Sequence, residues 1–176
     1  MKFMKISEIV SNFPEYAKDI KLNYTKILNE QVLNQNQLYG IILISSFSSQ
    51  LSALKDAALK EIDGKLDESF KEAVFGAYSI MSMNAIYYRF THLVTDTNYI
   101  TLPANLRMQY LTKHGIDKES FEMLCLAVAV IMGCGKCINA HEAILRENNI
   151  SNLIIQSVAR IASIINAIGN VMRVSK

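Results

Sequence analysis

Two thiols, an imidazole and a carboxylate follow one another in this 176-residue chain with the spacing Glu122-x11-Cys134-x2-Cys137-x3-His141. Residues three, four and seven positions apart lie on one face of an α-helix. Cys134, Cys137 and His141 have those spacings, so one helix would carry both sulfurs and the imidazole in a single column. These groups are the parts of a thiol-based redox site.

Glu122 can join this site only if the chain reverses. In one unbroken helix it would be about 18 Å from Cys134, too far to contact the imidazole. A reversal at Met132-Gly133 would form an αα-hairpin, with Gly133 adopting the backbone angles that other residues avoid. Glu122 and His141 would then lie roughly 16 Å and 12 Å from the turn. The sequence therefore predicts a carboxylate that meets the imidazole directly or through one water.

The expected chemistry depends on thiolate formation. A helix N-terminus or a histidine partner stabilises a cysteine thiolate. Cys134 is expected at the N-terminus of the second helix, whereas Cys137 has His141 one turn away as a base that Glu122 can orient. Helix-dipole reasoning alone favours Cys134 as the thiolate, so the residues by themselves leave the order of attack open.

Two other uses of the paired cysteines remain as alternatives. A CxxC pair can bind zinc, with His141 and Glu122 as further ligands, although the second pair typical of a structural zinc site is missing from the sequence. A structural disulfide is disfavoured because nothing in the sequence suggests secretion. Cys125 lies in the apolar run LCLAVAVIM and is expected to be an inert core thiol.

Composition places these residues in a helical domain. The chain is 51% hydrophobic with seven Gly and two Pro, which favours long helices, and its length suits a single domain over residues 1–176. The net charge of +2 predicts no nucleic-acid or membrane partner. Three cysteines without a signal-like N-terminus indicate a cytoplasmic protein. The apolar run Leu153–Val174 is interrupted by polar residues and is predicted to be a core helix.

No segment shows sustained strand alternation, so the expected fold class is all-α. Asp117 is the predicted N-cap of the helix that carries Glu122. Residues 99–102 are expected to be irregular. Pro103-Ala104-Asn105 is expected to open a connection to Leu106–Leu111. The other expected helices cover Ser7–Asn12, Glu15–Asn29, Asn36–Phe47, Leu51–Glu61, Asp67–Met81 and Met83–Phe90.

A weak internal repeat suggests two duplicated helical halves, approximately 1–105 and 106–176. Ala73–Phe90 resembles Leu124–His141 in outline, with chance similarity between apolar helices as the alternative. Superposition places Met83, Ile86 and Phe90 at the positions of Cys134, Cys137 and His141. The aromatic residues Tyr87, Tyr88 and Phe90 are expected in the core or at a subunit interface, and His92 and His114 are expected to be structural or exposed.

The CxxC segment and several others resemble the AhpD family of alkyl hydroperoxide reductases, within the carboxymuconolactone decarboxylase-like superfamily. The resemblance spans nearly the whole chain and implies the AhpD-like multi-helix fold. Its other segments are FPEYAKDIKLN (Phe13–Asn23), QLYG (Gln37–Gly40), MNAIYYRF (Met83–Phe90), LRM (Leu106–Met108) and AHEAILR (Ala140–Arg146).

The resemblance implies a lipoyl-dependent peroxidase that holds no bound cofactor or metal. Cys137 would attack an organic hydroperoxide and become a sulfenic acid, and Cys134 would act as proton donor and resolve it to a disulfide. His141 and Glu122 would relay protons, and dihydrolipoyl groups on a lipoyl-bearing protein would reduce the disulfide. The resemblance further implies an AhpC-type peroxiredoxin as partner and a homotrimeric assembly.

One residue departs from the family pattern, and two other functions stay open. Lys136 stands where the family often has His, and is expected to be a solvated helix residue.

Decarboxylation of a lactone acid, as in the superfamily's namesakes, needs no CxxC pair and is disfavoured. A disulfide carrier that passes electrons to a peroxiredoxin without direct peroxidase activity needs the dithiol but no His141–Glu122 relay.

Overall fold

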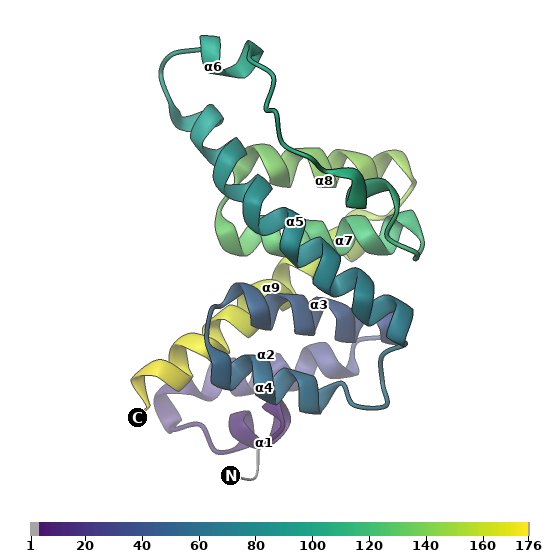
Figure 1. Cartoon of the computed structure of the whole chain (residues 1–176). Helices are drawn as coiled ribbons and strands as arrows, with labels where there is room; N and C mark the ends of the chain where they lie inside the picture. The colour runs from purple at the N-terminus through teal and green to yellow at the C-terminus, as the bar shows by residue number, and fades with distance from the viewer. Residues whose placement is uncertain (1–3, 176) are drawn as a thin grey trace.

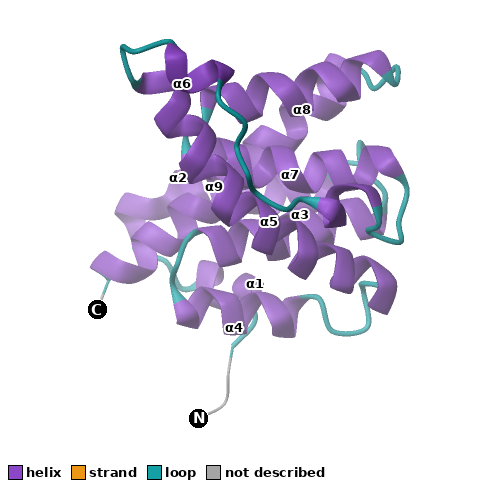
Figure 2. Ribbon diagram, turned by 45° about the horizontal axis from the view of Figure 1, so that its top comes forward, coloured by secondary structure: helices purple, strands orange, loops and turns teal. Residues whose placement is uncertain are grey.

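The computed structural model of the chain describes residues 4–175, and all regular structure within that range is helical (Figures 1 and 2). This confirms the all-α prediction. The elements are α1 (Ile6–Ser11), the short 3-10 helix η1 (Glu15–Ala17), α2 (Lys18–Asn29), α3 (Gln35–Ser48), α4 (Ser52–Glu61), α5 (Glu68–Leu93), α6 (Asn98–Thr101), the 3-10 helix η2 (Gln109–Thr112), α7 (Lys118–Met132), α8 (Gly135–Glu147) and α9 (Asn152–Val174).

The centre of the fold is formed by α3, α7 and α9, which contact one another. Helix α3 carries the fully buried run Ile41–Ile44, and α7 is buried along Met123–Ala129. A helix that is apolar around most of its circumference must be covered on several sides. Helices α4 and α5 cover α3, whereas α5 and α8 cover α7 (Figure 1).

Side chains at the helix starts satisfy backbone groups that the helices leave unpaired. Asn34 accepts a hydrogen bond from the Gln37 backbone N–H at 2.9 Å, and Asp117 accepts one from the Ser120 N–H at 2.7 Å. The predicted Asp117 cap is therefore confirmed. It fixes the start of the helix that carries Glu122.

Helix α9 is long and apolar enough to cross a membrane by length and composition alone. Its face that includes Val158, Ile161 and Ile165 is buried, and the helix contacts α2, α3 and α7. Its packing is that of a core helix, as predicted from the polar residues that interrupt the run.

Two expected element boundaries are wrong. The break predicted near Ser82 is absent, and α5 runs continuously from Glu68 to Leu93 because no Gly or Pro interrupts it there. The first member of the expected repeat is therefore one helix and not a hairpin, and the division into duplicated halves stays a prediction. Of residues 99–102, which were expected to be irregular, the first three belong to the short helix α6 (Asn98–Thr101).

The connection between α6 and α7 is anchored where it crosses α5. The Tyr110 ring lies against Gly76, where an added Cβ would overlap the ring, and the Tyr110 hydroxyl donates to the Glu72 carbonyl at 3.3 Å. Close approach of this kind requires glycine. The contact fixes η2 beside α5, and with it Met108 and Leu111.

Glu61 is a buried carboxylate that joins α4 to α1. It accepts hydrogen bonds from the backbone N–H of Ser7 at 3.1 Å and its hydroxyl at 2.7 Å, and from Lys65 Nζ at 3.0 Å. Burial raises the pKa of the Glu61 carboxyl, but the hydrogen bonds from Ser7 and the Lys65 ammonium outweigh it and hold the pKa below its ordinary value of 4.5.

Glu61 should make folding stability depend on acid pH. A carboxyl whose pKa is lowered by folding stabilises the protein above its unfolded-state pKa, and this stabilisation is lost as the pH falls through the folded-state pKa. The wild type should therefore lose unfolding free energy below pH 4.5, and Glu61→Gln should lose less of it. At neutral pH the variant should be about 1–3 kcal/mol less stable, because Ser7 and Lys65 lose their partner.

Urea titrations at several pH values measure both effects. Glu68→Gln is the matched control, because that carboxylate is 88% exposed. The same pH profile for the wild type and Glu61→Gln would contradict the prediction.

Candidate active site

The chain reverses between α7 and α8 at Gly133, as predicted. Gly133 ends α7 in the left-handed conformation (φ 66°), and the Cys134 N–H donates to the Ala129 carbonyl at 3.1 Å. Arg89 of α5 donates from Nη1 to the Met132 carbonyl at 2.7 Å. This hydrogen bond ties the turn to α5 and satisfies a carbonyl that the end of the helix leaves unpaired.

The two cysteines open α8 and are joined by a disulfide. Cys134 is the N-cap, as predicted, and its Sγ accepts a hydrogen bond from the Cys137 N–H at 3.3 Å. The Cα atoms of Cys134 and Cys137 are 5.3 Å apart, within the ordinary range for a disulfide. The structure therefore corresponds to the oxidised form of the CxxC pair.

The two sulfur-bearing residues differ in their access to the surface. Cys134 is fully buried, whereas Cys137 is 5% exposed and lines a pocket of about 440 Å³. His141, one helical turn further along α8, lines the same pocket. A molecule that enters this pocket meets Cys137 before Cys134.

The imidazole and the carboxylate are in direct contact. His141 Nδ1 lies 2.6 Å from Glu122 Oε2, and both side chains are 13% exposed. This confirms the expectation that the hairpin brings Glu122 from α7 to His141 on α8. Because Glu122 engages Nδ1, the remaining ring nitrogen Nε2 is the one available for proton transfer.

The pocket has a mostly apolar wall from α5 and from the segment before α7. The sequence did not identify these residues as a pocket wall, because the wall arises from packing between distant segments. MNAIYYRF nevertheless contains Asn84 and Tyr88, and LRM contains Met108. Besides Cys137 and His141, the lining residues are Met81, Asn84, Tyr88, Met108, Leu111, Lys136 and Ala140. The volume lies in the range typical of small-molecule sites.

Lys136 and Tyr88 both line the pocket, a location that the sequence did not predict for them. Lys136 lies on α8 and is half-buried at the pocket, with Nζ 5.1 Å from the centre of the Tyr88 ring, so it is a partly exposed helix residue that also lines the pocket. Tyr88 packs against the core, as expected, and also forms part of the pocket wall. The site therefore has a lysine next to Cys137 in its pocket wall.

The remaining cysteine and two histidines lie outside the site. Cys125 is fully buried, and burial, followed by the nearby Glu122 carboxylate, raises the pKa of its thiol well above the ordinary value. This agrees with its interpretation as an inert core thiol. His114 stacks on Phe121 with the ring centres 4.0 Å apart, and His92 is exposed, as expected.

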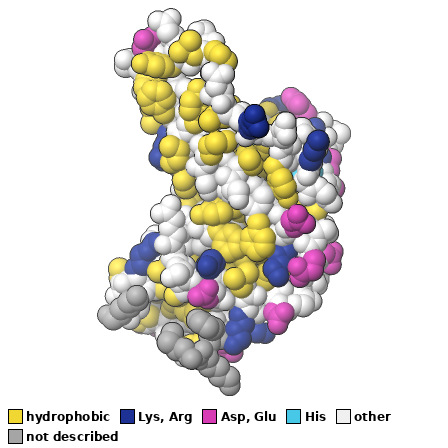
Figure 3. Space-filling view, viewed as in Figure 1, with side chains coloured by type: hydrophobic (Ala, Val, Ile, Leu, Met, Phe, Trp, Pro, Cys, Tyr) yellow, Lys and Arg dark blue, Asp and Glu magenta, His cyan; other side chains and the backbone are white. Residues whose placement is uncertain are grey.

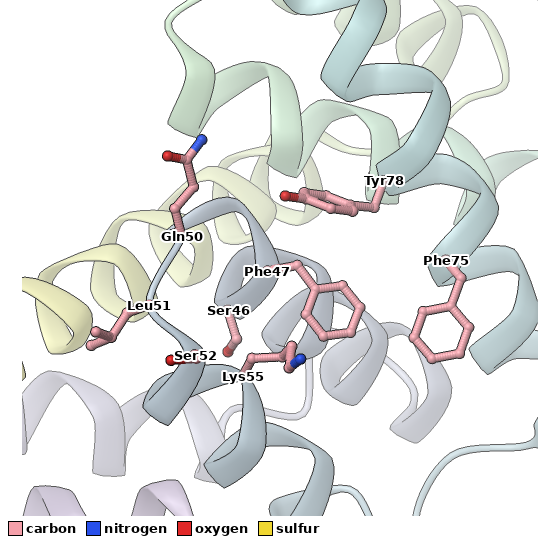
Figure 4. A pocket seen from close by; sticks show the side chains of 8 residues that line it. All are labelled: Ser46, Phe47, Gln50, Leu51, Ser52, Lys55, Phe75 and Tyr78. Carbon is pink, nitrogen blue, oxygen red and sulfur yellow. The ribbon is translucent and has the colours of Figure 1, made fainter.

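The four predicted site residues form no metal-ligand group in the described residues, and they lie outside the pocket between α3, α4 and α5. Within residues 4–175, no three His, Cys, Asp or Glu side chains are grouped as metal ligands, so the zinc alternative gains no support. A second pocket of about 300 Å³ lies between α3, α4 and α5, and Figure 4 shows its aromatic wall of Phe47, Phe75 and Tyr78. It contains none of the four predicted site residues.

An all-helical fold that presents a CxxC pair at a helix N-terminus, beside a carboxylate–imidazole pair, defines a thiol-based redox protein. Known proteins narrow this class. Proteins named alkyl hydroperoxide reductase AhpD are similar along nearly the whole chain: that of Brucella suis is 41% identical over 164 residues (93% of this chain, 94% of the relative). The protein of Acidobacterium capsulatum is 40% identical over 174 residues (98% of this chain, 95% of the relative). The protein of Coxiella burnetii is 44% identical over 161 residues (90% of this chain, 91% of the relative).

The carboxymuconolactone decarboxylase family matches residues 100–176, which include all four predicted site residues. These similarities show that the chain belongs to the AhpD family. The resemblance noted in the sequence is thereby confirmed.

The unequal burial of the cysteines predicts their order of alkylation. After reduction, Cys137 should react with iodoacetamide roughly tenfold or more faster than Cys134, because it faces the pocket beside a base. Cys125 should react most slowly. Peptide mapping by mass spectrometry measures the three rates, with urea-unfolded protein as the control in which the differences should largely disappear. Faster modification of Cys134 than of Cys137 would contradict the prediction.

Proposed function

We propose that this protein is a lipoyl-dependent alkyl hydroperoxidase. One observation carries the proposal: of the two paired cysteines, Cys137 lines the pocket, next to an imidazole that Glu122 orients. The name shared by the relatives, alkyl hydroperoxide reductase AhpD, supports the same reaction. The superfamily's decarboxylation chemistry would leave the CxxC pair without a role.

The first step is attack on the peroxide. His141 accepts the proton of the Cys137 thiol, and the thiolate attacks the terminal oxygen of the hydroperoxide. The O–O bond breaks, Cys137 becomes a sulfenic acid, and the alkoxide leaves as an alcohol after protonation by His141. Glu122 stabilises the imidazolium that forms between these transfers.

The second step closes the disulfide. The Cys134 thiol attacks the Cys137 sulfur, a water molecule leaves, and the pair reaches the disulfide form described above. Cα atoms 5.3 Å apart allow this bond without large backbone movement. A dihydrolipoyl group then exchanges its two thiols for a lipoyl disulfide and restores the dithiol.

The electron donor and acceptor are part of the proposal. The pocket volume of about 440 Å³ and its mostly apolar lining suit the end of a lipoyl arm from a lipoyl-bearing protein. An AhpC-type peroxiredoxin would exchange its own disulfide with the same thiols. A reducing cytoplasm is the compartment in which such a dithiol turns over.

A disulfide carrier without peroxidase activity is the second candidate. It needs the dithiol, whereas peroxide reduction also needs a proton for the leaving alkoxide. The direct contact between His141 and Glu122 favours the peroxidase, because simple thiol exchange does not require an oriented base. The two functions therefore make different demands on Glu122.

Two variants should separate the candidates. With dihydrolipoamide as sole reductant and metals chelated, Cys137→Ser should abolish consumption of cumene hydroperoxide. Glu122→Gln should slow peroxide consumption by roughly 10²–10⁴-fold, the range of general acid–base effects, and slow reduction of a small disulfide far less. Absorbance assays of lipoamide and residual hydroperoxide follow both reactions.

Glu142→Gln is the matched control, because this carboxylate lies on α8 and pairs with the surface residue Arg146. Full activity in Cys137→Ser, or equal losses of both activities in Glu122→Gln, would refute the peroxidase assignment. No turnover in the wild type would leave the carrier as the better account.

We further propose a homotrimer, assembled through an arm formed by residues 90–102. The arm projects from the body at the end of α5 and at α6, and hydrophobic side chains gather on it (Figures 1 and 3). Contiguous exposed apolar surface typically marks an interface. Its large exposed apolar side chains are Phe90, Leu93, Tyr99, Ile100 and Leu102.

A charged arm should prevent this assembly. The double variant Leu93→Lys/Ile100→Lys should sediment as a smaller species than the wild type, because lysine cannot be buried unpaired at an apolar interface. Leu22→Lys is the control, since Leu22 is similarly exposed on α2. A monomeric wild type, or a double variant that remains trimeric, would contradict the proposal.

A further inference from the structure

Asn84 is a buried polar residue with an unused hydrogen-bonding atom. It lies within α5, is 5% exposed, and its side-chain Oδ1 has no hydrogen-bond partner. An unpaired buried polar group costs about 1–3 kcal/mol, so most such groups are paired. An amide at this position therefore needs a hydrogen-bond partner that is not part of the chain.

The position of Asn84 indicates where that partner would bind. Asn84 lines the pocket together with Cys137 and His141, and its backbone oxygen lies 3.9 Å from Cys137 Sγ. The neighbouring wall residues Met81 and Leu111 are apolar. A ligand that reaches the Cys137 sulfur therefore has the Asn84 amide beside it as one of few polar contacts.

The chemistry of the amide restricts the ligand. The Asn84 side chain accepts through Oδ1 and donates through Nδ2, so its partner must form ordinary hydrogen bonds. A hydroperoxide has one O–H, on the same terminal oxygen that a thiolate attacks. A dithiol offers only weak S–H donors, so the amide would contribute little when the disulfide is reduced.

We propose that Asn84 is a substrate-binding residue whose side-chain amide hydrogen-bonds the hydroperoxide and holds its terminal oxygen at Cys137. This assignment rests on the proposed peroxidase function. In this step the sulfur–oxygen bond forms and the O–O bond breaks. The O–H proton stays on the sulfenic oxygen, and His141 protonates the alkoxide. Asn84 gains and loses no proton.

A neutral amide gives a distinctive kinetic signature. Because Asn84 does not titrate, its removal should lower the rate of peroxide attack by the same factor at every pH. A residue that acted by stabilising the Cys137 thiolate would instead shift the midpoint of the pH–rate profile. A purely structural residue would disturb both half-reactions.

The test separates the two half-reactions in the whole protein. Reduced wild type and Asn84→Leu, a variant of similar size, are mixed with cumene hydroperoxide, and thiol loss is followed by quenching over a range of pH. In a second assay, dihydrolipoamide reduces the oxidised proteins. Ser45→Ala is the control, because Ser45 Oγ is also buried and unpaired but lies on α3, away from the pocket.

We expect Asn84→Leu to slow oxidation by roughly 5- to 100-fold, the effect of losing a buried hydrogen bond, with an unchanged pH midpoint. Reduction by dihydrolipoamide should stay within about twofold of the wild type, as should both rates in the control. If Asn84→Leu does not fold, Asn84→Ala provides the same readouts without added bulk.

Three results would overturn the assignment: unchanged oxidation, a shifted pH midpoint, or equal slowing of oxidation and reduction. The last would indicate that Asn84 Oδ1 is satisfied by a structural water and supports the fold alone. A wild type that cumene hydroperoxide fails to oxidise would refute the peroxidase function itself, which keeps the two failures distinct.

Discussion

The contact between His141 and Glu122 is the constraint around which the site is built. Their atoms meet at 2.6 Å although 19 residues separate them in the sequence. This is possible because α7 ends at a left-handed Gly133 and α8 returns alongside it. Arg89 fixes the same turn from α5. The contact holds the imidazole in one orientation, which a base in repeated proton transfer requires.

Burial, and not the helix dipole, distinguishes the two thiols. The dipole argument favours Cys134, which is indeed the N-cap of α8. That position, however, places Cys134 inside the protein, whereas Cys137 reaches the pocket one turn further on. A peroxide can react only with a sulfur that it can approach. The arrangement therefore supports the proposed order, attack by Cys137 and resolution by Cys134, which the family resemblance also implies.

The sequence was sufficient to predict the parts of the site that depend on helical periodicity. The column of Cys134, Cys137 and His141, the reversal at Gly133 and the approach of Glu122 all follow from local spacing. The pocket wall did not follow, because Asn84 and Tyr88 reach it through packing of α5, more than 40 residues away. The continuity of α5 also differs from the prediction, which placed a break at Ser82. A serine gives no steric reason for a helix to end, and α5 continues through it.

The central claim, that Cys137 is the sulfur that attacks the peroxide, can be measured directly. Reduced Cys134→Ser and Cys137→Ser variants would each receive one equivalent of cumene hydroperoxide in the presence of a sulfenic-acid trap, followed by mass spectrometry. The account predicts trapped sulfenic acid at Cys137 in Cys134→Ser and essentially none in Cys137→Ser. Sulfenic acid formed at Cys134 at a comparable rate would contradict it.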